Sequence, residues 1–170
     1  MRYTKALGAA FLLAFFLIGC TKVARISDDT LEMAREHEVP IVFTWIRPGS
    51  PNSAGGVDAH VYFVNATDQP IRYVRIDVGA FNAVGDPVAS SIGRRHVGSL
   101  NATGPFAPGR GNGGLTRGAY WTNVWYNHSI RCIEVLKVEV EFMDRSKRVM
   151  DPDDVANALQ RGVRNNCRDV

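Results

Sequence analysis

The stretch EVLKVEVEF (residues 134–142) decides the fold class, because from Leu136 to Phe142 its side chains alternate strictly between apolar and charged. Successive side chains of a β-strand point to opposite faces of a sheet, so this alternation is typical of a half-buried strand. The expected inner positions are Leu136, Val138, Val140 and Phe142, and the expected outer positions are Lys137, Glu139 and Glu141. The stretch therefore predicts a sheet with one face packed on a core.

Two other stretches repeat this period of two. VDAHVYFVN (57–65) places Val57, Ala59, Val61 and Phe63 on one face, and YVRIDVGA (73–80) does the same with Val74, Ile76, Val78 and Ala80. Further candidate strands are PIVFTWI (40–46) and weaker stretches around residues 87–93, 96–103 and 120–126. The sequence thus predicts about seven short strands.

Turn signals separate these strands. Gly85-Asp86 is expected to form a hairpin turn with glycine in its first central position, and Gly55-Gly56 and residues 109–114 mark further breaks. Many short strands with frequent turns favour two packed antiparallel sheets. We expect a mainly β protein whose residues 39–150 form one immunoglobulin-like antiparallel β-sandwich.

The N-terminal segment has the form of a secretory signal. Arg2 and Lys5 precede an apolar run of 13 residues (6–18), which is shorter than the roughly 20 that span a bilayer. The four residues LIGC (17–20) resemble the bacterial lipobox, which implies cleavage after residue 19 and lipid attachment, including fatty acids such as palmitate, at Cys20. Because Thr21 stands where an inner-membrane retention signal would have Asp, the resemblance favours the outer membrane, facing the periplasm. Residues 20–38 would then be a lipidated cysteine and tether, with a helix-compatible stretch at residues 30–37.

Removing residues 1–19 leaves 18 lysines and arginines against 17 acids. A net charge of about +1 gives no reason to expect nucleic-acid binding. Of the three cysteines, lipidation would use Cys20 and leave Cys132 and Cys167. In an oxidising envelope such a pair predicts a disulfide, the alternative being two unrelated thiols.

The C-terminal stretch MDPDDVANALQRG (150–162) carries helix signals. Asp151 is the expected N-cap, Pro152 the first helical residue and Gly162 the stop. Residues 151–170 are therefore predicted to hold a short helix of about ten residues followed by a tail that Cys167 ties back to Cys132.

Two stretches carry a resemblance beyond the lipobox. FNAVGDPV (81–88) and YWTNVWYNHSIRCIEVLKVEVEFMD (120–144) resemble a domain of uncharacterised exported proteins of proteobacteria. Phe81 and Arg145 stand where that domain usually has tyrosine and glycine. The resemblance spans about residues 57–144 and implies no activity.

Patterns for enzymatic or cofactor chemistry are weak. GRGNGG (109–114) satisfies G-x-G-x-x-G, but an aromatic strand rather than a helix follows, so a loop is favoured over a phosphate site. There is no G-x-S-x-G motif, and the histidines are spread singly, at His37, His60, His96 and His128. We expect no catalytic residues, no metal site and no cofactor.

The chain contains no acid between Asp86 and Glu134, yet it carries a group of basic side chains there. The group is Arg94, Arg95, Arg110, Arg117 and Arg131, with His96 and His128. Since the planar guanidinium suits phosphate and carboxylate, the group predicts an anion-facing patch. The alternative is that these arginines point in different directions.

The stretch YWTNVWYN (120–127) is the second candidate binding feature. In an ideal strand Trp121, Asn123, Trp125 and Asn127 share one face. If that face were exposed, the tryptophans could stack on sugars or anchor a protein partner. We favour the alternative that they fill the core.

These observations predict a lipid-anchored envelope lipoprotein that is not an enzyme and acts as a protein-binding, accessory or assembly module. The expected partners are the membrane, through the lipid anchor, and an envelope protein. The alternative is a lipoprotein that binds a glycan or a small anionic ligand through Trp121, Trp125 and the arginine-rich loops.

Overall fold

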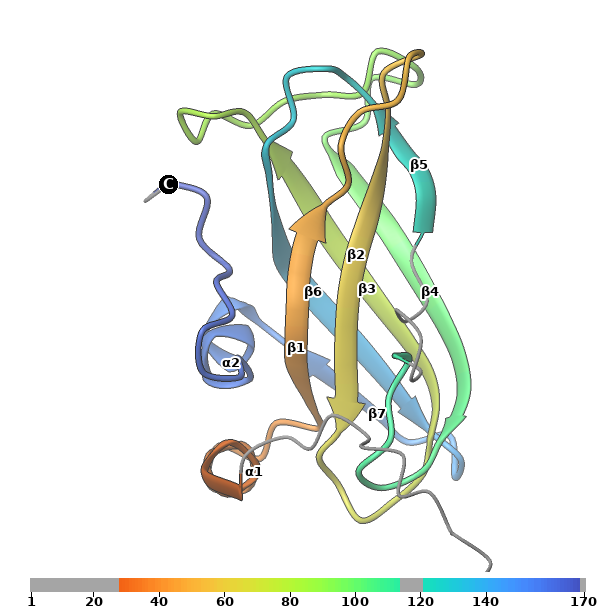
Figure 1. Cartoon of the computed structure of the whole chain (residues 1–170). Coiled ribbons are helices and arrows are strands. Elements are labelled where there is room, and N and C mark those ends of the chain that lie inside the picture. Colours follow the sequence, from red (N-terminus) through yellow and green to blue (C-terminus); the bar gives the residue numbers. More distant parts are fainter. Residues whose placement is uncertain (1–27, 114–120, 169–170) are drawn as a thin grey trace, which may run out of the picture.

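The computed structural model describes residues 28–113 and 121–168. Seven strands and two helices follow one another along the chain (Figure 1). The strands are β1 (Ile41–Pro48), β2 (Gly56–Asn65), β3 (Ile71–Phe81), β4 (Val97–Phe106), β5 (Trp121–Tyr126), β6 (Cys132–Phe142) and β7 (Lys147–Met150); the helices are α1 (Asp28–Glu36) and α2 (Pro152–Asn157).

The strands form two antiparallel sheets, one in the order β1-β2-β5 and the other in the order β4-β3-β6-β7. In the constant-type immunoglobulin sandwich the fourth strand pairs with the fifth, whereas here it pairs with the third. The remaining strand neighbours are the same. The predicted immunoglobulin-like sandwich is confirmed, with its fourth strand on the opposite sheet.

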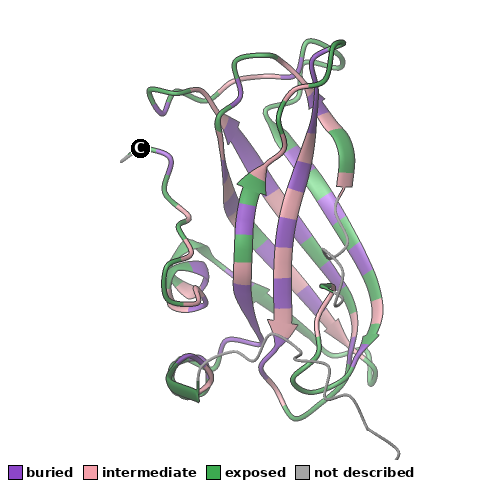
Figure 2. Ribbon diagram, in the orientation of Figure 1, coloured by how far each residue is buried: buried purple, intermediate pink, exposed green. Residues whose placement is uncertain are grey.

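The core lies between the sheets, and buried residues alternate with exposed ones along the strands (Figure 2). The inward residues predicted for β2 and β3 are buried. In β6 the alternation breaks, because Val78 pairs with Val135 while Asp77 pairs with Lys137. Leu136 is the extra residue of this bulge, so Val135 takes the inner position expected for Leu136.

Two strand predictions need correction. Residues 87–93 form no strand, and the short β7 was missed because only Met150 of its four residues is buried. The turn before residue 87 also differs from the expected one. Gly85 lies at its end, at φ +79°, and donates its N–H to the carbonyl of Asn82. The Asn82 side chain accepts from the main chain of Val84 and Asp86, which closes the turn.

The C-terminal helix begins as predicted, since the Asp151 side chain accepts from the main chain of Asp153 and Asp154. It ends at Asn157, five residues before the expected stop at Gly162. The outer edge of β1 captures the chain there. The Phe43 N–H donates to Ala158 at 2.7 Å, and the Gln160 N–H donates to the Phe43 carbonyl at 2.9 Å.

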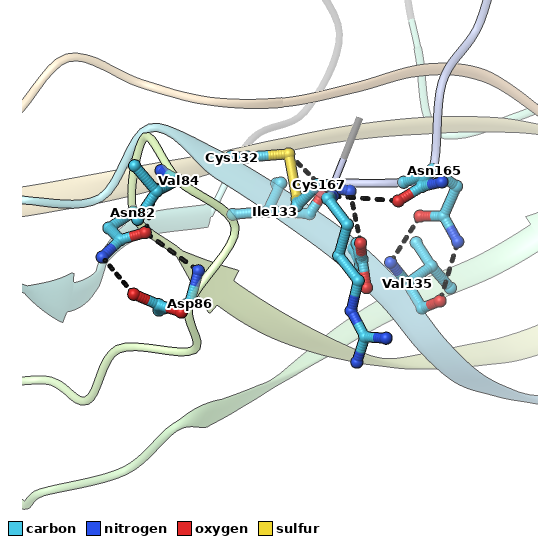
Figure 3. The surroundings of a disulfide bond; sticks show 11 residues. Asn82, Val84, Asp86, Cys132, Ile133, Val135, Asn165 and Cys167 are labelled. Carbon is cyan, nitrogen blue, oxygen red and sulfur yellow. Dashed lines mark hydrogen bonds between the residues drawn. A yellow bond between two sulfur atoms is a disulfide. The ribbon is translucent and has the colours of Figure 1, made fainter. Parts of the chain in front are cut away.

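The structure joins Cys132 and Cys167 in the predicted disulfide (Figure 3). The Asn165 side chain bonds both the N–H and the carbonyl of Val135, at 2.6 and 2.9 Å, and Glu134 accepts from the Cys167 main chain. The tail after α2 is therefore fixed against the start of β6. Gly85 lies so close to the tail that a Cβ there would come within 2.8 Å of the Cys167 carbonyl oxygen.

Helix α1 corrects the predicted tether. Its residues Thr30 and Ala34 are buried, and the Ala34 carbonyl accepts from Val39 at the entrance to β1. The packed part of the chain therefore includes residues from Asp28 onward and is not limited to those after Val39. Cys20 and the rest of the predicted signal and tether up to residue 27 lie outside the described residues.

Asn65, fully buried at the end of β2, ties two loops to the sandwich. Its Nδ2 donates to the carbonyls of Gln69 and Phe106, at 2.7 and 2.9 Å. Its Oδ1 accepts from the main chain and the hydroxyl of Thr67. Four hydrogen bonds in a buried position make this side chain a structural rather than a binding residue.

Replacing Asn65 by Ala should lower the free energy of unfolding by about 2–4 kcal/mol, because buried partners lose their hydrogen bonds. Asn101→Ala is the matched control, since Asn101 begins the same Asn-Ala-Thr tripeptide but is exposed and accepts one bond, from Arg75. It should cost about 0.5 kcal/mol or less. Urea unfolding measures both, and equal losses would contradict the role given to Asn65.

Replacing both Cys132 and Cys167 by Ser should lower the free energy of unfolding by about 3–4 kcal/mol, from the loop that their 35-residue separation closes. Urea unfolding with and without reductant measures the effect. Alkylation of both thiols in the unreduced native protein would show that the bond is absent.

Candidate functional site

The arginines predicted to form a patch are split between the two ends of the sandwich. Arg94 and Arg95 lie in the turn before β4, near the first residue of β2, where Ser91 bonds Tyr126 and Tyr126 pairs with Gly56. Arg110 lies at the other end of β2, where its carbonyl accepts from Asn65. The ten residues of β2 span about 30 Å. The described arginines therefore do not form one patch, and Arg117 lies outside the described residues.

The two predicted tryptophans do not share one exposed face. Trp125 is fully buried and Trp121 is half-buried, with its indole N–H on the Asn101 carbonyl at 3.1 Å. Trp125 pairs with Val57 and Trp121 with Ala59, so β5 holds two more residues than β2 between these pairs. Asn123, at φ +50°, lies within this bulge. The preference for a core role is confirmed for Trp125.

Two predicted binding residues do come together. Arg95 and Trp121 line a hollow of about 430 Å³ between β4 and β5. The hollow is shallow, and the Trp121 indole N–H is already occupied there. The Trp121 ring and the Arg95 side chain are the two predicted binding groups that line it, beside the polar side chains of Ser99, Thr122 and Asn123.

The described part of the glycine run covers an edge of β2. The Asn112 side chain accepts from Phe63 N–H and donates to the Val61 carbonyl, each at 2.9 Å. A Cβ on Gly111 would lie 1.6 Å from the Phe63 carbonyl oxygen, so only glycine fits. The described part of the run is therefore a loop, as favoured from the sequence, and these contacts give it a structural role.

A larger cleft of about 570 Å³ lies between the second half of β1, the start of β6 and the C-terminal tail. We call it the arginine cleft, and define it by Trp45–Pro48, Arg131–Ile133, Gly162–Arg164 and Asn166. Two smaller hollows adjoin it, and Arg131 lines both of them. Arg131 is therefore the residue common to the recessed surface at this end of the sandwich.

The Arg131 guanidinium is held in place by its own loop. Its Nη1 donates to the carbonyls of His128 and Ile130, at 2.7 and 2.8 Å. Nε and Nη2 make no hydrogen bond within the described part of the chain. These two nitrogens form the fork that binds a carboxylate or phosphate in bidentate fashion.

Arg47 and Trp45 form the β1 wall of the cleft. The Arg47 guanidinium stacks over the Trp45 ring, 4.5 Å from its centroid, and 42% of Trp45 is exposed. Stacking fixes the guanidinium plane and leaves its edges open to an anion. Arg164 extends from the tail on the other side of the cleft.

Within the part of the chain that the structure describes, the positive charge of the cleft is not compensated by acids. No carboxylate of the described residues lies within ion-pair distance of Arg47, Arg131 or Arg164. On the other sheet two cations do have acidic partners: Arg72 pairs with Glu141 at 2.9 Å, and Lys147 with Glu139 at 2.8 Å. The Lys147 hydrogen bond also lowers the pKa of the Glu139 carboxyl. The cleft therefore favours an anionic ligand.

Sequence reasoning identified Arg131 within the basic group but missed Trp45, Arg47 and Arg164. They lie on an edge strand and a tail more than 100 residues apart, so no local pattern connects them. The predicted disulfide carried the one useful signal, because Cys167 brings the tail to the start of β6 beside Arg131. Within the described ranges, no three His, Cys, Asp or Glu side chains gather as metal ligands would.

Neither described helix is long and apolar enough to cross a membrane. Comparisons with known protein families, curated proteins and solved structures find no match for this chain. The resemblance of residues 81–88 and 120–144 to an exported domain therefore stays a prediction, and functional inference rests on the fold and the arginine cleft.

Proposed function

We propose that this protein is a lipid-anchored module of the bacterial envelope, attached through Cys20, that binds an acidic partner protein in the arginine cleft and catalyses no reaction. The observation that carries the proposal is the cleft itself, where three arginines that have no acidic partner among residues 28–113 and 121–168 surround a hollow of about 570 Å³. A recess of this size suits a ligand or a protruding segment of a partner. Arginine and tryptophan are the residues most enriched among interface anchors.

The position of the cleft suits a protein that is anchored at its N-terminus. The chain enters the sandwich through α1, beside the first residue of β1 (Figure 1). The cleft begins at Trp45 and extends past Pro48, so its far end lies about 20 Å along β1 from that entrance. In an outer-membrane lipoprotein, this end would be presented to the periplasm and to partners there.

Two features favour a protein over a glycan in the cleft. Arg47 covers one face of the Trp45 ring, which a stacked sugar would need. The remaining recognition groups are guanidiniums, which suit carboxylates. The alternative is a glycan or a small anionic ligand. The hollow at Trp121 and Arg95 favours it, and the arginines of the cleft would also accept a small anion. That alternative predicts a change in tryptophan fluorescence with envelope sugars that Trp121→Ala abolishes.

A photo-crosslinking amino acid at position 45 should trap a discrete protein in intact cells, because Trp45 lines the cleft. The same substitution at Tyr73 is the matched control: 41% of Tyr73 is exposed, and it lies under the Arg72 guanidinium on the other sheet. Mass spectrometry of the adducts compares the two positions. Equal products from both positions, or none from position 45, would contradict the proposal.

The anchor is tested in the same cells. With Cys20→Ser the chain loses the predicted lipidation site, so the position-45 adduct should fall sharply if binding depends on membrane placement. The protein should also move to the soluble fraction. Retention of Cys20→Ser in the membrane fraction would be evidence against the lipid anchor, while leaving the cleft to be judged by the adducts.

A further inference from the structure

We infer that the occupant of the arginine cleft is an extended acidic peptide segment whose main chain pairs with β1 at Ile46 and whose carboxylate binds Arg131. The inference rests on the proposed function, since it names the part of the partner that the cleft would take. It is carried by two independent observations, an unpaired stretch of strand edge and an unpaired guanidinium fork.

The first observation concerns the direction of the β1 main chain. On β2, the Phe63 N–H and Val61 carbonyl bond Asn112, so both residues direct their main chain away from β1. Ile46 is opposite Val61 in the antiparallel pairing. Residues opposite one another both bond inward or both point outward. The Ile46 N–H and carbonyl therefore point away from β2, to the side of the cleft that Ile46 lines.

The same edge already accepts a chain one step earlier. Phe43 directs its main chain outward and bonds Ala158 and Gln160 in a parallel bridge at Leu159. β1 has one extra residue between Phe43 and Trp45. Because of this bulge, the next residue whose main chain points away from β2 is Ile46. Within the described residues nothing bonds the Ile46 main chain on this side. The edge thus pairs at Phe43 and is open at Ile46.

The described part of the tail, up to residue 168, leaves this opening uncovered. After Gln160 it turns at Gly162, and then Asn165 and Cys167 fix it to β6. The cleft is the space left between β1 and the tail. The segment after α2 pairs with β1 only at Phe43 and then turns toward β6. The part of the β1 edge that it leaves open can pair with a second extended chain.

Main-chain pairing there is short. Pro48 is the next outward residue and has no N–H, so the pairing offers the two groups of Ile46 and the Pro48 carbonyl. Three main-chain bonds give little discrimination, so specificity falls to side chains. The side chains of the cleft that carry charge are all arginines, and this complementarity selects an acidic segment.

Arg131 is the expected carboxylate site. The His128 and Ile130 carbonyls hold its Nη1, so its fork is oriented before a ligand arrives and less side-chain freedom is lost on binding. Arg47, stacked on Trp45, adds a second fixed guanidinium on the β1 side. Alternate side chains of an extended segment point to the same side. A segment paired with β1 can therefore direct two acidic side chains, two residues apart, toward the arginines.

The test uses a display library of random seven-residue peptides, selected on the full chain purified in detergent. Selected peptides should be enriched in Asp and Glu, and Arg131→Ala should weaken their binding at least tenfold, whereas Arg72→Ala should leave it unchanged. Arg131→Lys keeps the charge but lacks the fork, so it should lose several-fold. Each variant is checked for an unchanged melting temperature. Raising salt from 0.05 to 0.5 M should weaken binding further.

Hydrogen exchange of the peptide complex tests the main-chain pairing, since the Ile46 amide should become protected while the Tyr73 amide stays unchanged. Alternate amides of an extended peptide point to opposite sides, so the peptide can be N-methylated at either of two sets of amides. Methylation of the set that faces β1 should abolish binding, and methylation of the other set should not. Peptides without acid enrichment, indifference to Arg131→Ala or an unprotected Ile46 would each overturn the inference. A selection that yields no binding peptide would also overturn it, and so would such a result together with binding of polygalacturonate, an acidic glycan. A protein trapped at position 45 in cells together with an empty selection would leave the proposed function standing and remove the peptide inference alone.

Discussion

The structure depends on how the edges of its two sheets are closed, because every main-chain donor and acceptor left at an edge needs a partner. The edge of β2 beyond β5 is closed by Asn112 and Gly111, whose loop approaches it as a strand would. The edge of β1 is closed at Phe43 by the chain after α2. These closures position the loops and the tail around the core. The arginine cleft lies where closure of the β1 edge stops.

The strand pattern predicted the sandwich well, since β2 and β3 alternate as their sequences do. It was less accurate wherever a strand contains a bulge of one or two extra residues. The bulge at Leu136 places Val135 rather than Leu136 at an inner position of β6. The bulge around Asn123 leaves Trp125 buried in the core while Trp121 stays half-buried. Bulges are set by pairing with a neighbouring strand, so a single strand's sequence does not reveal them. The end of α2 was misplaced for a related reason, because β1 captures the chain before Gly162.

The candidate site was harder to predict than the fold. The basic stretch between Asp86 and Glu134 indicated a patch, yet the ten residues of β2 separate Arg110 from Arg94 and Arg95. Charge density along a chain does not become charge density in space when strands cross the whole domain. The cleft arises from three segments, and of its arginines only Arg131 belonged to the basic stretch. What distinguishes them is that all three line one hollow, which is a property of packing.

The disulfide has a consequence that concerns timing. The tail wall of the cleft, with Arg164, is fixed to β6 through Cys132 and Cys167. In a reducing cytosol these cysteines would remain thiols, and that wall would lack its covalent attachment. A chain whose two thiols are still reduced would therefore lack one covalently fixed wall of the cleft. If the protein is exported as proposed, oxidation in the envelope would complete the recess in the compartment of its proposed partner.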